Sequence, residues 1–333
     1  MTISKNTLPL AITAGEPAGI GPALVAKLWQ KRKELDLPPF LFVGPKDIFQ
    51  QHGLDIPVTC IKQPDTKTAS IFKTSLPVID LPLDGPITLG EINPRHASMV
   101  IQSIKTATAL ALKGDVAGIV TNPIQKASLY AEGFSFQGHT DFLAHLAGLA
   151  PTDTIMMLMA ENLRVVPVTI HIPLKNVAST LTSDAIVKAT VTTAIDLRNR
   201  FGITNPRFAI AGLNPHAGES GTIGLEEGTH IIPAIRTLQD MGISVTGPHP
   251  ADTLFHAEAR ENYDAVIAMY HDQALIPIKT LDFYGGVNVT LGLNFIRTSP
   301  DHGTALNKVK TGNARPDSLL AAIRCAHMMA NHQ

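Results

Sequence analysis

Short apolar runs alternate with stretches of helical periodicity along almost the whole chain of 333 residues, and this alternation restricts the fold. Residues 8–14, 116–121 and 265–270 are predicted strands, because each is a brief apolar run. Residues 183–201 and 318–332 are predicted helices. Strands that alternate with helices are typical of α/β layers with much parallel sheet. Since no flexible linker divides the chain, we expect two α/β domains whose sheets are continuous or interleaved.

The composition excludes several classes of protein. Hydrophobic residues make up 44% of the chain and charged residues 17%, which is typical of a globular protein. A net charge of −1 gives no reason to expect a nucleic-acid or membrane partner, and no apolar run reaches the roughly 20 residues of a membrane helix. Residues 1–7 lack the apolar stretch of a signal peptide, and Cys60 and Cys325 lie in no CxxC pattern. We therefore expect a cytoplasmic protein with free thiols.

Three histidines, His171, His216 and His271, each follow a predicted strand in a polar segment. Strands of open α/β sheets end at the crevice where ligands bind, and three imidazoles there could hold one divalent metal. A single histidine in such a place is more often a hydrogen-bonded core or rim residue. None of the three has the spacing of an HExxH motif, so the metal hypothesis depends on convergence in the fold. Five other histidines lie in helical or surface contexts and are predicted to be solvated: His52, His96, His230, His327 and His332.

Two loops of small residues could approach a nucleotide. Residues 13–22 connect a predicted strand to a predicted helix, and their glycines at 15, 19 and 21 do not follow the GxGxxG spacing. A Rossmann dinucleotide site is therefore not indicated there, and a tight turn alone would also explain the glycines. Residues 299–305 form a second loop of small and polar residues, which could cradle a nucleotide or simply be a turn.

A further group of residues suits an anionic substrate. Residues 138–141 resemble a helix N-terminus with Thr140 near the cap, where backbone amides and the helix dipole favour a phosphate. Lys279 follows His271 closely, Asn288 opens a strand, and Arg297 lies on a polar turn. Lysine and arginine beside a helix N-terminus often bind a phosphate monoester, although each residue alone is more often a surface charge.

Taken together, these segments closely resemble the 4-hydroxythreonine-4-phosphate dehydrogenase family of pyridoxal phosphate biosynthesis, which is related to the isocitrate and isopropylmalate dehydrogenases. The resemblance covers nearly the whole chain. It implies two α/β domains that flank a cleft, without the GxGxxG Rossmann fold. We expect residues 1–135 with 300–333 to form one domain and residues 136–299 to form the central one, which contributes metal and dimer contacts. The matching motifs are GEPAGIGP at 15–22, GHT at 138–140, GLNPHAGE at 212–219, PADT at 250–253, MYHDQ at 269–273 and DHGTA at 301–305.

The resemblance also implies roles for individual residues. His171, His216 and His271 would bind the metal, with His271 supplied by the other subunit of a homodimer whose active site lies at the subunit interface. Three neutral imidazoles favour zinc, with cobalt, manganese and magnesium as alternatives. The substrate and its phosphate would be held by His139, Thr140, Lys279, Asn288 and Arg297, and NAD, or alternatively NADP, by Asp301, His302, Gly303, Thr304 and Ala305.

The implied reaction is the NAD- and metal-dependent oxidation of 4-phosphooxy-L-threonine to 2-amino-3-oxo-4-(phosphooxy)butanoate, which loses CO2 to give 3-amino-2-oxopropyl phosphate. A base must take the hydroxyl proton, and Asp252, Asp272 and Lys126 are the candidates. For each carboxylate, orienting a metal-bound imidazole is an equally good interpretation.

Two alternative functions remain open from the sequence. Similar enzymes oxidise phosphorylated four-carbon sugar acids such as 4-phospho-D-threonate or erythronate, and no residue indicates which substituent at C2 is recognised. The fold also resembles that of phosphate acyltransferases, so a transferase or a catalytically silent metal-binding protein is a third hypothesis. The complete histidine set and the loop at 301–305 argue against the third hypothesis.

Overall fold

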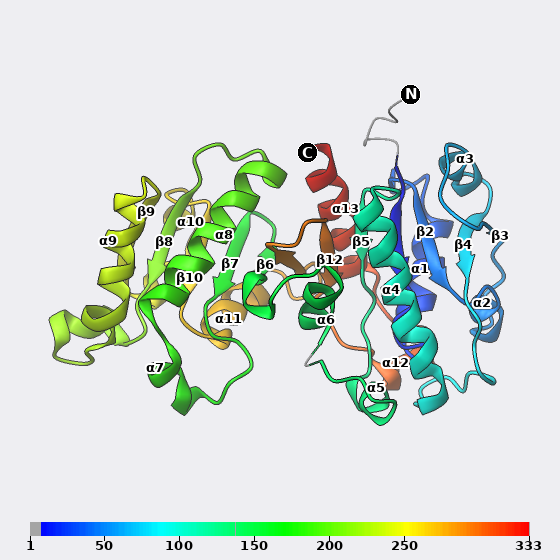
Figure 1. The fold of residues 1–333 in the computed structure, drawn as a ribbon, viewed down its shortest axis with the longest axis horizontal. Helices are drawn as coiled ribbons and strands as arrows, with labels where there is room; N and C mark the ends of the chain where they lie inside the picture. The colour runs from blue at the N-terminus through cyan, green and yellow to red at the C-terminus, as the bar shows by residue number, and fades with distance from the viewer. Residues whose placement is uncertain (1–7, 137, 333) are drawn as a thin grey trace. The chain divides into compact units, whose positions relative to one another are not determined.

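The structure is a computed structural model that describes residues 8–136 and 138–332, and the chain divides into two compact α/β units (Figure 1). The first unit comprises Met1–Pro151 and Leu293–Asn331, and the second comprises Thr152–Gly292. The seven N-terminal residues, in which we expected no signal peptide, lie outside the described part. The α/β class expected from the alternation of strands and helices is confirmed, and each unit is described below by itself.

The unit boundaries differ from the expected ones at residues 135 and 299. Helix α6 (His139–Leu146) packs against α4 (Ala97–Lys113) and therefore belongs to the first unit. The chain from Leu293 onward also belongs there, because it leads into a strand that pairs within that unit, with Ile119 N donating to Ile296 O at 2.9 Å. Local sequence patterns do not reveal these contacts, since both depend on residues far away in the sequence.

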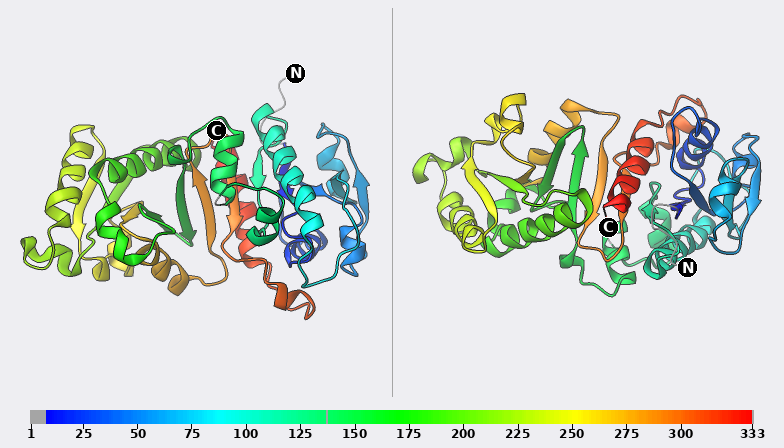
Figure 2. Two further views of the ribbon diagram at one scale, coloured as in Figure 1. Left: turned by 60° about the horizontal axis from the view of Figure 1, so that its bottom comes forward. Right: turned by 90° about the horizontal axis from the view of Figure 1, so that it is seen from above.

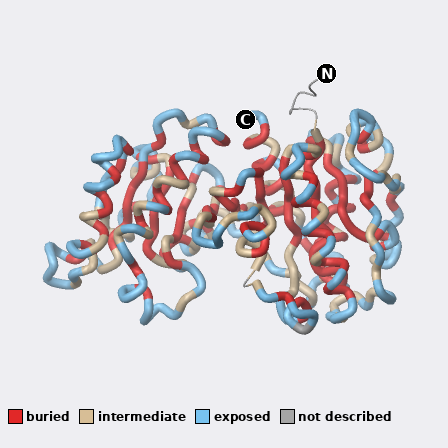
Figure 3. The backbone as a smooth tube through the Cα atoms, viewed as in Figure 1, coloured by how far each residue is buried: buried red, intermediate tan, exposed pale blue. Residues whose placement is uncertain are grey.

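The first unit contains a fully parallel sheet in the order β3-β4-β2-β1-β5-β12. Most of its strands are buried on both faces, as expected for strands covered by helices on both sides, whereas the edge strand β3 is partly exposed. Figure 3 shows this burial as continuous red segments. The strands are β1 (Leu10–Thr13), β2 (Phe40–Gly44), β3 (Val58–Cys60), β4 (Leu76–Asp80), β5 (Gly118–Val120) and β12 (Arg297–Pro300).

Helices cover both faces of this sheet (Figure 2). The long helix α4 follows a short turn in which Asn93 Oδ1 accepts from Arg95 N at 3.2 Å, and it ends at Gly114, whose φ of 75° is left-handed. The same turn contains His96, which is 1% exposed, so the expectation that this histidine is solvated is wrong. The other elements are α1 (Gly21–Gln30), α2 (Ile48–Gln51), α3 (Thr68–Phe72), η2 (Pro94–His96), α5 (Lys126–Ala131), α12 (Leu306–Val309) and α13 (Asp317–Asn331).

The second unit contains a mixed sheet in the order β11-β6-β7-β10-β8-β9. Strands β6 and β7 form an antiparallel hairpin, while β7, β10, β8 and β9 run parallel. The strands are β6 (Ile155–Ala160), β7 (Leu163–Pro167), β8 (Arg207–Ala211), β9 (Ser244–His249), β10 (Ala265–Ala268) and β11 (Val287–Leu291).

The principal helix of this unit is α8 (Ser183–Phe201), which has the predicted bounds because both ends carry capping signals. Thr182 Oγ1 accepts from Ala185 N at 3.2 Å, and Gly202 closes the helix with a φ of 69°. The other elements are η3 (Pro151–Asp153) at the unit boundary, η4 (Leu174–Asn176), α7 (Val177–Thr180), η5 (Pro215–Gly221), η6 (Glu227–Ile231), α9 (Ile232–Asp240), η7 (Ala251–Thr253), α10 (Ala257–Arg260) and α11 (His271–Leu281). Among the described residues, no helix is both long and apolar enough to span a membrane.

Candidate functional site

The three histidines predicted to bind a metal follow three neighbouring strands of the second unit. Strands β7, β10 and β8 are adjacent and parallel, so their carboxyl ends lie at one edge of the sheet. His171 follows β7, His271 is the first residue of α11 after β10, and His216 lies in η5 after β8. Ligands of α/β proteins bind at this kind of edge, so the placement is that of a functional site.

Two of these histidines lie side by side. The ring centroids of His171 and His271 are 5.7 Å apart, and both rings line a cavity of about 270 Å³. The Nδ1 of His271 lies 2.7 Å from Oδ1 of Asp272, so the imidazole can donate to the carboxylate and leave Nε2 for a ligand. This contact favours the orienting role, which is one of the two interpretations for Asp272.

His216 does not line this cavity, and within the described residues of a single chain no three His, Cys, Asp or Glu side chains form a group that could hold a metal. The predicted set is therefore only partly assembled in one chain. Two imidazoles that face a common cavity are suitable ligands for zinc or cobalt, but a catalytic site requires a third protein ligand. The donor chemistry fits such a metal, and a complete donor set requires a further contribution.

The segment around His216 has an unusual backbone conformation. Five successive residues, 216–220, have φ values between 43° and 79°, and only Gly218 is a glycine. A left-handed conformation costs a non-glycine residue roughly 1–2 kcal/mol, so this turn needs support from its surroundings. A methyl group on Gly218 would lie 2.5 Å from Oε2 of Glu227, which shows how closely that carboxylate packs against the turn.

Glu227 provides much of that support. This buried carboxylate accepts from Leu213 N at 2.8 Å and from Asn214 N at 2.7 Å through Oε1, and from Asn214 Nδ2 at 2.9 Å through Oε2. It thus fixes the two residues that lead into the Pro215–His216 step. Sequence reasoning gave Glu227 no role, because nothing distinguishes it from its neighbour Glu226 in the sequence.

The remaining predicted residues of the second unit lie in η7, on α11 and on β11. Asp252 and Asp272 both line a cavity of about 420 Å³. The ammonium of Lys279 lies 5.3 Å from the centroid of the Phe283 ring. Asn288, on β11, has a buried Oδ1 without a hydrogen-bond partner, which is an unsatisfied acceptor that a ligand could satisfy.

Charge and a helix N-terminus converge in the first unit around His139, the first residue of α6. Its buried Nε2 has no hydrogen-bond partner. Burial, followed by the positive charges of Arg297 and Lys126, holds the pKa of His139 well below its usual 6.5, so the imidazole is neutral at neutral pH. The Nζ of Lys126 lies 3.7 Å from the position that a methyl group on Gly138 would occupy, and Gly138 is the N-cap of α6.

Arg297 is the buried member of this group, with 3% of its surface exposed. Its Nη2 and Nε donate to Thr121 Oγ1 at 2.7 Å and 3.2 Å. Burial lowers the pKa of Arg297 to about 10, so the guanidinium keeps its charge at neutral pH. The predicted Thr140 is the second residue of α6 and lies inside its first turn, while Gly138 takes the cap position that we expected near Thr140. Two cations, an unpaired imidazole nitrogen and helical amides together suit a phosphate.

The two predicted nucleotide loops meet within the first unit. Ile20 N donates to Thr304 O at 3.1 Å, and a methyl group on Gly19 would lie 2.9 Å from the same oxygen. Asp301 N donates to Ser318 Oγ at 2.9 Å, which joins the loop to α13. Of the other predicted residues, His302 Nδ1 lies 2.9 Å from Gly303 O, and Ala305 has a left-handed φ of 45°.

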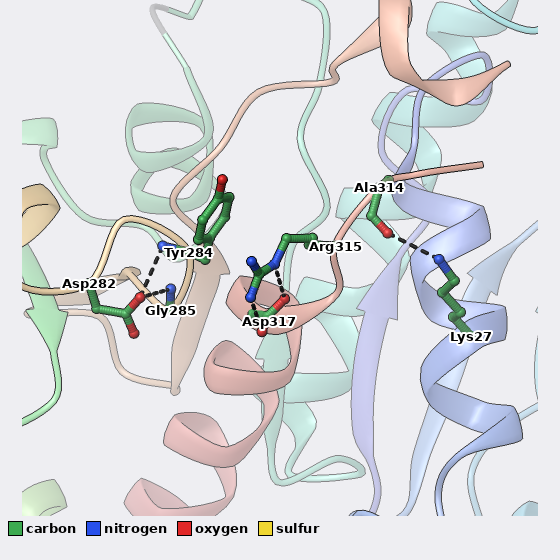
Figure 4. A network of polar contacts seen from close by, with 7 residues as sticks. All are labelled: Lys27, Asp282, Tyr284, Gly285, Ala314, Arg315 and Asp317. Atoms are coloured by element: carbon green, nitrogen blue, oxygen red, sulfur yellow. Dashed lines mark hydrogen bonds and ion pairs between the residues drawn. The ribbon is translucent and has the colours of Figure 1, made fainter. Parts of the chain in front are cut away.

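Further polar contacts hold the chain that follows this loop (Figure 4). Lys27 Nζ donates to Ala314 O at 3.1 Å, and Arg315 Nε donates to Asp317 Oδ2 at 3.0 Å at the start of α13. In the second unit, Asp282 Oδ1 accepts from Tyr284 N at 3.0 Å and closes the turn after α11. These contacts stabilise segments near the predicted ligand-binding residues.

Comparison with known proteins gives one consistent result. The family model described as pyridoxal phosphate biosynthetic protein PdxA matches residues 36–326. The chain is 49% identical to the 4-hydroxythreonine-4-phosphate dehydrogenase of Caulobacter vibrioides, over 97% of each chain, and 50% identical to that of Ruegeria sp., over 96% of each. The crystal structure of 4-hydroxythreonine-4-phosphate dehydrogenase from Klebsiella pneumoniae superposes with a TM-score of 0.86 at 38% identity, covering 97% of this chain and 99% of that one.

Proposed function

Because the chain belongs to the family of pyridoxal phosphate biosynthetic proteins PdxA, we propose that it is a dehydrogenase of 4-phosphooxy-L-threonine. The net reaction converts this substrate and NAD, or alternatively NADP, to 2-amino-3-oxo-4-(phosphooxy)butanoate and the reduced nucleotide. The β-keto acid then loses CO2 and gives 3-amino-2-oxopropyl phosphate. The relatives described above are named 4-hydroxythreonine-4-phosphate dehydrogenase, and each matches this chain over nearly its whole length.

The observation that carries this proposal is the anion site around His139. Its unpaired Nε2, the charge of Arg297 and Lys126, and the N-terminus of α6 provide donors and positive charge within one unit. A phosphate monoester matches that chemistry. Thr140 adds a hydroxyl in the first turn of α6, and we propose that Lys279 and Asn288 also contact the substrate.

We further propose that His171 and His216 of one subunit, with His271 of the other, hold a divalent metal, for which zinc is favoured over cobalt, manganese and magnesium. When bound, such an ion supplies Lewis-acid polarisation of the substrate oxygen that becomes a carbonyl. The chain's own contribution is to aim the imidazoles, as Asp272 does for His271. With Asp272 in this role, Asp252 is the preferred candidate for the base that receives the hydroxyl proton. Lys126 could take that proton only as a neutral amine, whereas the anion site uses its positive charge.

A homodimer is part of the proposal, because a single chain does not assemble three metal ligands among its described residues. The second unit exposes large apolar side chains near the ends of its strands and along α11: Leu174 is 70% exposed, and Ile276 and Phe283 are each 64% exposed. Such side chains are enriched at protein interfaces. Light scattering on the purified protein should give twice the mass of one chain.

The test is reduced-nucleotide formation by the purified protein with 4-phosphooxy-L-threonine and with 4-phospho-D-threonate in parallel. Each reaction is run after chelation and again after addition of zinc, cobalt, manganese or magnesium. Metal-dependent turnover of the amino acid supports the proposed function. Preference for the threonate would assign the protein to sugar-acid oxidation, and absence of turnover with both would contradict the proposal.

A further inference from the structure

Gln273 is a buried polar side chain to which neither the sequence nor the proposed reaction gives a role. Its Oε1 accepts from Met269 N at 2.6 Å, and its Nε2 donates to Gly212 O at 2.8 Å. Met269 directly follows β10 and leads into His271, while Gly212 directly follows β8 and leads into the His216 turn. One amide group therefore connects the two segments that carry these histidines.

The Gln273 side chain takes the place of the backbone hydrogen bonds between β10 and β8, which end at this point. Strand β10 ends at Ala268 and β8 at Ala211, because beyond these points one chain enters α11 and the other enters the left-handed turn. The Met269 N–H and the Gly212 C=O would then lack backbone partners. The Gln273 amide has one acceptor and donors in the geometry of a peptide group, and it satisfies both atoms.

The same residue sets the rotation of α11 about its axis. His271 and Gln273 are two residues apart at the start of the helix, which places them roughly 200° apart around it. When Gln273 is held in the core, His271 is directed to the opposite side, where it lines the cavity shared with His171. Thr169 connects a third segment to Met269. Its Oγ1 donates to Met269 O at 2.7 Å, which joins the segment that carries His171 to the end of β10.

We infer that Gln273 is a positioning residue that holds both the His216 turn and the His271 end of α11 in the places from which each contributes a ligand to a metal site shared with the partner subunit. The inference rests on the metal site of the proposed function. It assigns no chemistry to Gln273, which acts only through the two backbone segments that it connects. Without the amide, each histidine still follows its own strand, but the segments that carry His216 and His271 lose the contact that fixes them at the sheet edge.

The experiment compares Gln273→Met, which removes both hydrogen bonds at similar volume, with Thr193→Ala as a matched control. Thr193 is a buried residue of α8 whose Oγ1 donates to Ala189 O at 2.7 Å, a hydrogen bond that lies within the helix. Cobalt binding to the full-length protein is measured by competition with a chelator and by the visible absorption spectrum. Hydrogen–deuterium exchange of peptides covering residues 212–224 is measured on the chelated protein.

Gln273→Met should weaken cobalt binding by about 10- to 100-fold, the range seen when groups that orient metal ligands are lost, and it should accelerate exchange at 212–224. The control should keep the affinity and spectrum of the unmodified protein. If Gln273→Met does not fold, Gln273→Glu serves instead, because a carboxylate still accepts from Met269 N but cannot donate to Gly212 O. Unchanged cobalt affinity and exchange in the folded variant would overturn the inference alone. Failure of the unmodified protein to bind any of the four metals would contradict the metal site and the inference with it.

Discussion

Arg297 is a single residue in which burial and charge oppose each other. Its guanidinium is buried and its pKa is lowered to about 10, but it remains charged at neutral pH and can donate to a phosphate. We expect Arg297→Met to raise KM for the phosphorylated substrate by roughly 10- to 100-fold, which corresponds to the loss of one hydrogen bond to a charged group. Steady-state kinetics measures this effect. The neighbouring change Thr121→Val, which removes the hydroxyl that Arg297 contacts, should have a smaller effect. Equal KM values for Arg297→Met and the unmodified protein would rule out this residue as a phosphate ligand.

Asp252 and Asp272, which line one cavity, should differ in their effect on cobalt binding. Asp272 lies 2.7 Å from the His271 ring, whereas Asp252, in η7, has no contact of this kind among the described residues. We therefore expect Asp272→Asn to weaken cobalt binding by about tenfold, because the amide no longer stabilises the oriented imidazole. Asp252→Asn should leave cobalt binding unchanged. Isothermal titration on chelated protein distinguishes the two, and an equal effect of both variants would contradict the division of roles.

At the scale of elements, the left-handed turn at 216–220 depends on Glu227. Glu227→Ala leaves the Leu213 and Asn214 amides without their acceptor, and each lost partner costs roughly 1–3 kcal/mol. We expect the free energy of unfolding to fall by about 2–4 kcal/mol in a urea titration, after the turn relaxes and water replaces part of the contact. Glu226→Ala is the matched control, since Glu226 contacts only the Asn214 side chain in this turn. An equal decrease in the free energy of unfolding of both variants would show that the Glu227 contacts to the Leu213 and Asn214 amides add no stability of their own.

The sequence predicted elements well where the signal is local. The bounds of α8 follow from Thr182 and Gly202, and those of β11 from a short apolar run, because capping and periodicity act within a few residues. The placement of three histidines beyond strand ends was also predicted and is confirmed. What the sequence could not reveal depends on distant neighbours. The roles of Glu227 and Gln273 and the burial of His96 all arise from packing between segments that are separated along the chain.

At the scale of the whole molecule, buried histidines make stability sensitive to acid. Burial lowers the pKa of four histidines from 6.5: His52, His96, His139 and His249. In the unfolded chain these side chains take up protons near pH 6.5, but in the folded chain they do so only at lower pH. The unfolded state therefore binds more protons in this window, and stability falls as pH decreases through it. The carboxyl groups of Glu16 and Asp196 have raised pKa values and affect stability in the opposite direction. Their contribution to stability decreases as the pH rises above their ordinary pKa values of 4.5 and 3.8.

We therefore expect the midpoint of urea unfolding, measured with chelator present, to be lower at pH 5.5 than at pH 7.5. His96→Gln should reduce this difference, because His96 is buried and its proton uptake is suppressed only in the folded state. His256→Gln, at an exposed position, should leave the difference as it is in the unmodified protein. The comparison separates a property of buried imidazoles from a general effect of acid. If the His96 and His256 variants respond to pH alike, the acid sensitivity arises from groups other than the buried histidines.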